Sequence, residues 1–463
     1  MRKNFAKNFG IVFLLLSICI LFAQDKSAGA IDLQDLNKIR EEANINEETR
    51  ATINAVTNNS IRDLALNRSN VGSVDHLFDY KIEPPSITDQ KSSGRCWLFT
   101  ALNVLRPKIV EKYNLKDFEF SESYLFFWDQ FEKANTFLEN VIQTRDLDMY
   151  NRRTQHLFKR PIGDGGAWQM MPPLVEKYGV VPKQAMEETH NSENTRQMRS
   201  LLKTKLRQQG LKLRSYENKS EEFLRDKKVE MLSDIYRILV ISMGNPPEEF
   251  IWRYVENDDS TIVEKNYTPQ EFYQEAVEPY LGNYVMLMDV PSKEYYKYYE
   301  IEWNRNRYDS QNWTFVNVPS EELAKYAKKS ILNDEPMYFS CDVGAQLNRD
   351  AGIVDVDNYD YESLFEVSFD MTKEERILSY ESGSTHGMAL IGIDTTESGD
   401  VQKWLLENSW GDDAGYKGYL TMTDAWFDAY SFRLVVKDDF LPEKIIKITK
   451  EEPILLPPWD RMQ

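Results

Sequence analysis

The sequence predicts an α+β fold, with helices first along the chain and a sheet later. Downstream of a polar loop at residues 90–95, apolar residues recur at spacings of three and four, which is typical of a buried helix. In the last third, short β-prone runs are separated by Gly and Asp turns, a pattern typical of an antiparallel sheet. The predicted strands fall at residues 337–341, 388–393, 403–406, 419–422 and 433–436.

The composition is that of a folded globular protein, with 41% hydrophobic and 13% aromatic residues among 463. The formal net charge of −19 gives a surface that repels phosphate backbones and anionic lipid headgroups. No basic stripe along the sequence is long enough to reverse this effect. We therefore expect no nucleic-acid partner.

The N-terminus has the pattern of a signal peptide over residues 1–23. Basic residues within the first seven positions precede an apolar run at 11–22, which is too short for a comfortable membrane span, and Ala23 could end the signal. This predicts a secreted or periplasmic protein without other membrane association. The alternative that this segment is retained as a membrane anchor remains. Lipid anchoring at Cys19 is disfavoured by the bulky Ile18 before it.

Two further segments have an expected local structure. Residues 24–75 are polar and poor in aromatics, and we expect an N-terminal arm with helical pieces. Residues 192–240 are dense in Leu, Lys, Arg and Glu with helical periodicity, which predicts one or two amphipathic helices.

The segment QKSSGRCWLF at residues 90–99 places Cys96 at the start of the predicted buried helix, which Pro107 kinks or ends. Free backbone N–H groups and the macrodipole at a helix N-terminus favour a thiolate. Once a signal peptide is removed, Cys96 and Cys341 are the only cysteines left. Cys341 lies in an apolar run and is interpreted as a small buried hydrophobic residue.

A nucleophilic cysteine needs a base and donors for an oxyanion. Gln90 could place its amide beside the backbone N–H of Cys96. Of four histidines, His386 lies in a loop that leads into an apolar strand, and the segment ENSWG follows it. There Asn408 could orient the imidazole and Trp410 could shield their hydrogen bond. Such chemistry needs no metal or other cofactor, and we find no metal-ligand cluster in the sequence.

These residues resemble the papain superfamily, and more narrowly the bleomycin hydrolase and aminopeptidase C family. The resemblance runs from about residue 75 to the end. Cys96 and His386 lie 290 positions apart, whereas simple papain-like enzymes need roughly 130–150. The segments that carry the resemblance are SESYLFFW at 121–128, GDGGAW at 163–168, VEKYGVVP at 175–182, CDVG at 341–344, NSWG at 408–411, KGY at 417–419 and MTD at 422–424.

The resemblance implies a papain-like, two-lobed fold with a helical lobe and an antiparallel β-sheet lobe. It implies a peptidase domain at 76–440, a helical insertion at about 190–330, and a C-terminal arm at 441–463 that enters the active-site cleft. It also implies a homohexameric ring, which sedimentation would test.

The resemblance also assigns roles to residues. It gives Cys96, His386 and Asn408 the catalytic roles and Gln90 the oxyanion hole. Peptide substrates would bind at Gly165, Gly166, Trp410 and the terminal Gln463, whose carboxylate would hold the free amine of the substrate. The implied activity is a cysteine-type aminopeptidase that acts through a thioester acyl-enzyme.

Three other functions stay open at this point. A short arm would leave the cleft open, and the enzyme would then be a papain-like endopeptidase. A catalytically inactive binding homologue would share the fold, although the complete set of catalytic residue types argues against it. A Cys-His-Asn acyltransferase would use the same residues but would form amine-dependent products.

Overall fold

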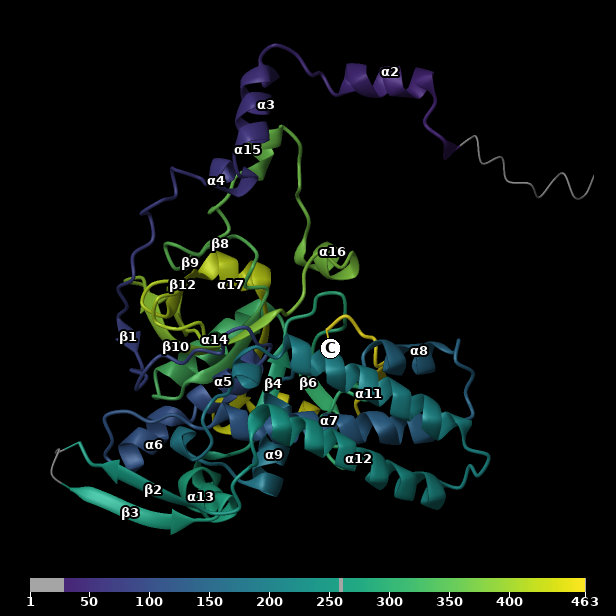
Figure 1. The fold of residues 1–463 in the computed structure, drawn as a ribbon. Helices are drawn as coiled ribbons and strands as arrows, with labels where there is room; N and C mark the ends of the chain where they lie inside the picture. Colours follow the sequence, from purple (N-terminus) through teal and green to yellow (C-terminus); the bar gives the residue numbers. More distant parts are fainter. Residues whose placement is uncertain (1–28, 258–260, 463) are drawn as a thin grey trace, which may run out of the picture. The chain divides into compact units, whose positions relative to one another are not determined.

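The computed structural model describes residues 29–257 and 261–462 (Figure 1). The predicted signal peptide at 1–23, with Cys19, and the terminal Gln463 lie outside the described residues. The described residues divide into two compact units, the first made of 29–66 with 361–366 and the second of 67–257, 261–360 and 367–462. Within the described ranges, no helix is long and apolar enough to cross a membrane.

The first unit is helical, as expected for the arm. Asp32 starts its first helix by accepting hydrogen bonds from the backbone N–H groups of Gln34 and Asp35, at 2.7 and 2.8 Å. The sequence did not predict that residues 361–366 would join this unit. Its helices are α2 (Leu33–Glu42), α3 (Thr49–Asn58), α4 (Ile61–Ala65) and α15 (Tyr361–Phe365).

A 12-stranded sheet forms the centre of the second unit. Its order is β14-β5-β6-β4-β13-β7-β10-β11-β12-β9-β8, and β1 pairs with β10. All five predicted strands are present, as β7, β10, β11, β12 and β13. The strand bounds are β1 (Tyr80–Lys81), β4 (Tyr284–Met288), β5 (Lys297–Ile301), β6 (Trp313–Asn317), β7 (Met337–Cys341), β8 (Leu347–Asn348), β9 (Ile353–Val354), β10 (His386–Thr395), β11 (Val401–Glu407), β12 (Tyr419–Thr423), β13 (Ser431–Lys437) and β14 (Ile454–Leu456).

The sheet is mixed, which corrects the expected purely antiparallel arrangement. The five predicted strands pair with one another antiparallel, but β12 with β9, β14 with β5 and β4 with β6 are parallel. Parallel neighbours need a long connection that returns the chain to the same end of the sheet. Such connections bring together strands that are distant in sequence, and short apolar runs do not reveal their direction.

The second unit also contains helices, of which α5, α14 and α17 contact strands of the sheet. The helix that starts at Cys96 ends at Asn103, and Pro107 lies in the first turn of the next one, as the sequence predicted. The helices are α5 (Cys96–Asn103), α6 (Arg106–Lys112), α7 (Glu122–Gln143), α8 (Arg152–Lys159), α9 (Met171–Tyr178), α10 (His190–Glu193), α11 (Arg196–Ser215), α12 (Glu221–Met243), α13 (Pro269–Ala276), α14 (Ser320–Ile331), α16 (Lys373–Leu378), α17 (Asp424–Tyr430) and α18 (Glu443–Ile448), with 3₁₀ turns η2 (Trp168–Met170), η3 (Lys183–Ala185), η4 (Glu278–Tyr280) and η5 (Asp438–Phe440).

The predicted insertion at about 190–330 is only partly helical. The two expected amphipathic helices are α11 and α12, which pack against each other and against α7 (Figure 1). A hairpin of β2 (Phe250–Val255) and β3 (Ile262–Tyr267) follows, and then β4, β5 and β6 join the main sheet. The expectation of a helical insertion was therefore wrong for residues 250–317, where strands alternate with short helices, because β4 and β5 are stabilised by pairing with the distant β13 and β14.

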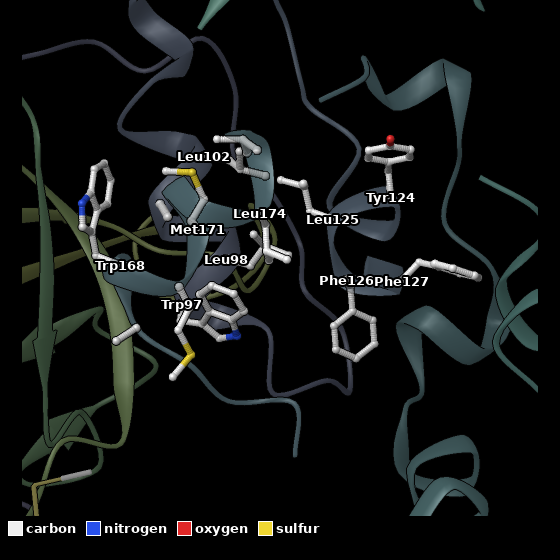
Figure 2. Close-up of a cluster of buried hydrophobic side chains, with 14 of the residues drawn as sticks. Trp97, Leu98, Leu102, Tyr124, Leu125, Phe126, Phe127, Trp168, Met171 and Leu174 are labelled. Atoms are coloured by element: carbon white, nitrogen blue, oxygen red, sulfur yellow. The ribbon is translucent and has the colours of Figure 1, made fainter. Parts of the chain in front are cut away.

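The central sheet separates two hydrophobic cores. Along β10, Ala389 and Ile391 belong to one core, whereas Met388 and Leu390 belong to the other, as strand alternation requires. In the first core, Trp97, Leu98 and Leu102 of α5 lie among side chains of α7, η2 and α9 (Figure 2). Every residue of α5 after Cys96 is buried, and each large apolar side chain contributes roughly 1.5–3 kcal/mol. The helix that carries Cys96 is thus held rigidly.

Candidate active site

Cys96 is the first residue of α5, and the loop before it is tied down by hydrogen bonds. The backbone N–H of Gln90 donates to the carbonyl of Ser409 at 2.8 Å, and the Ser93 hydroxyl donates to the carbonyl of Gln90 at 2.6 Å. Arg95, whose side chain is fully buried, pairs with Glu188 at 2.8 Å. No side chain caps the start of α5, so its first N–H groups and the positive end of its dipole remain available to an anion near Cys96.

His386 and Asn408 meet at the ends of adjacent strands. His386 is the first residue of β10, and Asn408 directly follows β11. The Nε2 atom of His386 lies 2.8 Å from Oδ1 of Asn408. Because an amide oxygen only accepts, Nε2 donates in this bond, which leaves Nδ1 as the nitrogen that can serve Cys96.

Trp410 lies against this histidine. The ring centroids of Trp410 and His386 are 4.8 Å apart with an interplanar angle of 30°. Trp410 is not among the residues that line the cavity at Cys96. The structure therefore places it where it can shield the His386–Asn408 bond, and it does not bring Trp410 into that cavity as a substrate contact.

Cys96 and His386 shift each other's pKa in the directions expected of an ion pair. Burial by itself raises the pKa of Cys96, but the charge of His386, its hydrogen bond and backbone contacts at Gly387 and Trp97 bring the pKa below its usual value. Burial by itself lowers the pKa of His386, but the charge of Cys96 and hydrogen bonds to Cys96 and Asn408 raise it overall. These two pKa shifts favour the ionised pair, in which Cys96 is a thiolate and His386 is an imidazolium.

This pair predicts a bell-shaped dependence of kcat/KM on pH. Activity should rise as the pair loses its first proton, below the usual pKa of a thiol, and should fall as the imidazolium loses its proton, above the usual pKa of histidine. Initial rates on one peptide across the pH range would measure both limbs. A single sigmoid that rises near the ordinary thiol pKa would contradict the ion pair.

Gln90 is positioned to complete an oxyanion site. Its side chain is buried and lines the same cavity as Cys96. Its Oε1 accepts a hydrogen bond from the Ser409 hydroxyl at 2.7 Å, and its Nε2 donates to the carbonyl of Ser93 at 2.7 Å. These two bonds fix which way the amide points. The amide has a second proton, and this one can be offered to a ligand.

The cavity at Cys96 has a volume of about 590 Å³, and Gly165 and Gly166 line it. A Cβ atom on Gly166 would lie 2.6 Å from the Trp97 ring, so only glycine fits there without movement. A Cβ on Gly165 would meet nothing within 4 Å. The structure thus places Cys96, His386, Gln90, Gly165 and Gly166 around one cavity, with Asn408 hydrogen-bonded to His386.

Comparisons with known proteins agree with this fold. The model of the family described as "Peptidase C1-like family" matches residues 30–463. This chain belongs to that family. It is therefore a cysteine peptidase, and its helix-and-sheet architecture is the papain-like peptidase fold.

Individual relatives agree with this assignment. Aminopeptidase C of Lactobacillus delbrueckii subsp. lactis is 40% identical over 420 residues, which cover 88% of this chain and 92% of the relative. Human bleomycin hydrolase is 38% identical over 422 residues, which cover 88% and 93%. The crystal structure of PepW from Lactobacillus rhamnosis HN001 has a TM-score of 0.90 at 35% identity and covers 94% of this chain and 99% of its own.

Sequence reasoning missed Arg433, which also lines the cavity of this peptidase. Its guanidinium lies 3.8 Å from the centroid of the Trp313 ring, and its Nη2 donates to the carbonyl of Met462 at 2.6 Å. Met462 is buried, so the C-terminal segment contacts a residue of the cavity wall. The signal that could have identified Arg433 from the sequence is its position as a charged residue within the apolar run at 432–436.

Cys341 is buried, as predicted, and burial raises the pKa of its thiol well above the usual value. A protonated buried thiol is a poor nucleophile. Cys341 pairs in register with His386 on the neighbouring strand, which gives it a packing role. Over residues 29–257 and 261–462, no group of three or more His, Cys, Asp or Glu side chains could hold a metal ion.

Proposed function

We propose that this chain is a cysteine aminopeptidase that removes residues from the free N-terminus of peptides. The observation that carries this proposal is the C-terminal segment, whose Met462 reaches Arg433 at the cavity beside Cys96. In this proposal Gln463, which lies outside the described residues, supplies a carboxylate that binds the substrate amine. The names of the relatives, aminopeptidase C and bleomycin hydrolase, agree with this activity.

The proposed mechanism uses the triad of Cys96, His386 and Asn408. The thiolate attacks the scissile carbonyl carbon, and the resulting oxyanion accepts hydrogen bonds from the Gln90 amide and the backbone N–H of Cys96. His386 then donates its proton to the leaving amine, and a thioester remains on the sulfur. Next, His386 takes a proton from water, the hydroxide attacks the thioester, and the released acid leaves the thiolate restored.

Two kinds of element line the cavity, which supports a two-lobed arrangement. Cys96 and Trp97 come from α5, whereas Tyr338, His386 and Arg433 come from the sheet. In this proposal a peptide lies between the two groups, and Gly165 and Gly166 offer backbone to it at close range. The hexameric ring, the secreted or periplasmic location and the lack of a nucleic-acid partner stay predictions.

Moving the chain terminus tests the carboxylate as an anchor. We expect the enzyme to hydrolyse a free peptide stepwise and to leave its N-acetylated form intact. Extending the chain by two glycines moves the carboxylate by up to about 7 Å. This variant, or deletion of residues 462–463, should lose the preference for the free form by at least about tenfold, because the amine loses its partner. Mass spectrometry of products, with Cys96→Ala as the inactive control, measures this.

Each other result has a defined meaning. If both altered termini keep the preference for free peptides, the carboxylate is not the anchor. If the unaltered enzyme cleaves both peptide forms internally, it is an endopeptidase. If it cleaves neither form, the inactive homologue is the better description.

A further inference from the structure

A second cavity, of about 700 Å³, opens beside the catalytic cavity and shares Arg160, Ser384 and Thr385 with it. A smaller cavity of about 190 Å³ shares Arg160 with both. We call the larger of these two neighbouring cavities the basic groove. Its titratable side chains, apart from two tyrosines, are Arg152, His156, Lys159, Arg160, Asp460 and Arg461.

Negative charge is scarce along these three cavities, although the chain has 75 acidic and 56 basic residues. The acidic residues among their described linings are Asp164 and Asp460. Asp164 lies 2.9 Å from Arg199, and Asp460 lies 2.9 Å from Lys293. Each carboxylate thus has its own cation, and neither is paired with Arg152, Lys159 or Arg461.

Aromatic rings hold two of the groove's guanidinium groups in place. The guanidinium of Arg152 lies 4.1 Å from the ring centroid of Trp459, and that of Arg461 lies 4.8 Å from that of Tyr380. A guanidinium stacked on a ring keeps its edge N–H groups available for a carboxylate. In the described part of the chain, Arg152, Lys159 and Arg461 form no ion pair with a carboxylate.

The cations lie close enough to act on one another. Burial lowers the pKa of His156, and the positive charges of Arg160 and Arg152 lower it further. Like charges gathered in this way repel each other, and this repulsion is relieved when an anion binds between them. The groove also opens at Ser384 and Thr385, directly before His386, so a ligand held there lies next to the catalytic centre.

We propose that the basic groove is a substrate subsite for carboxylate side chains, so that the enzyme prefers peptides with Asp or Glu near the scissile bond. This inference rests on the proposed peptidase function and adds a substrate class to it. The ligand is a short acidic peptide rather than a nucleic acid. The net charge of −19 repels a long polyanion, whereas a few carboxylates of a bound peptide would lie within one Debye length of the cations.

The test compares peptides that differ by one charge. Tetrapeptides on an alanine background carry Glu or Gln at each position in turn, and kcat/KM is measured at low and high salt. We expect at least one position at which Glu exceeds Gln by about tenfold or more at low salt, with the ratio falling at high salt. In parallel, the Kd of each peptide for the Cys96→Ala variant is measured, because this binding does not depend on turnover.

Matched variants then locate the effect. R152Q/K159Q removes two charges from the groove and should reduce the Glu-to-Gln ratio at least about fivefold. K325Q/K447Q removes two charges elsewhere on the exposed surface and should leave the ratio unchanged. Because Arg152 packs on Trp459, K159E serves as a second groove variant, with one exposed side chain altered. It should also reduce the ratio.

The outcomes separate this inference from the proposed function. Equal turnover and equal Kd for Glu and Gln peptides would overturn the subsite, as would a preference that survives in both groove variants. If wild type cleaves no peptide but Cys96→Ala still binds Glu peptides more tightly, the aminopeptidase proposal fails and the subsite stands. If a short single-stranded oligonucleotide inhibits more strongly than hexaglutamate and Glu shows no advantage, the groove binds nucleic acid and our inference is wrong.

Discussion

Replacing His386 by alanine should lower kcat/KM on the order of 10⁴-fold or more, because attack and protonation of the leaving group both depend on this ring. The alkylation rate of Cys96 by iodoacetamide near neutral pH should fall as well, since the thiolate loses the charge that lowers its pKa. Asn408→Ala should have a smaller effect. The imidazole is retained, and only the 2.8 Å hydrogen bond that orients it is lost. Peptide hydrolysis and mass-spectrometric labelling measure these effects.

His76 supplies a matched control for this experiment. Its Nδ1 lies 2.8 Å from the Thr421 hydroxyl, and its ring stacks on Tyr416 at 3.9 Å. It contacts no residue of the candidate site in these interactions, so His76→Ala should change activity little. Cys341 should resist alkylation in every folded variant because it is buried. Equal losses in the His76 and His386 variants would point to unfolding, and an active His386→Ala enzyme would refute the triad.

Replacing Arg106 by methionine should destabilise the fold by about 3–5 kcal/mol at pH 8, because it removes hydrogen bonds to two backbone carbonyls and leaves ionised Glu407 without its partner. The Arg106 side chain is fully buried, and its Nη1 lies 3.5 Å from Oε1 of Glu407. It also donates hydrogen bonds to the carbonyls of Phe118 and Ser86, at 2.7 and 2.9 Å. Glu407 directly precedes Asn408, so activity should fall together with stability. Chemical denaturation of the two proteins measures the difference.

The pH dependence of this loss identifies Glu407 as its source. Burial raises the pKa of Glu407 to about 8, against 4.5 for the free residue, although Arg106 counteracts this. A raised folded-state pKa means that the stability Glu407 contributes is complete below about pH 4.5 and is lost as the pH rises toward 8. The penalty of Arg106→Met should therefore be smaller at pH 5 than at pH 8.

A double variant provides the control for this prediction. Glu407→Gln removes the charge while keeping the shape, so Arg106→Met combined with Glu407→Gln should be more stable at pH 8 than Arg106→Met alone. It should not regain full stability, because the hydrogen bonds of Arg106 to backbone carbonyls are still missing. A loss of equal size at pH 5 and pH 8, or in the single and double variants, would show that Glu407 is not the cause.

The sequence by itself determined which residues are candidates for the active site, because each lies in a short segment whose chemistry is local. A cysteine that starts an apolar helix, a histidine that starts an apolar strand and an asparagine that ends the next strand can be identified without knowing their distances. The same reasoning located β7, β10, β11, β12 and β13 and the start of α5. Hydrophobic periodicity and turn residues determine local structure over a few positions, so the sequence alone reveals them.

Only the tertiary structure decided the direction of the distant strands, the place of Arg433 and the basic groove. Strand direction depends on which segments meet across the sheet, as for β14 beside β5. Arg433 becomes notable only because Met462 returns to it. The groove joins Arg152 and Lys159 of α8 to Arg461 near the chain end, while the net charge of −19 predicted the opposite potential. The Coulomb energy of two charges depends on their distance in space, and a net charge counted from the sequence contains no distances.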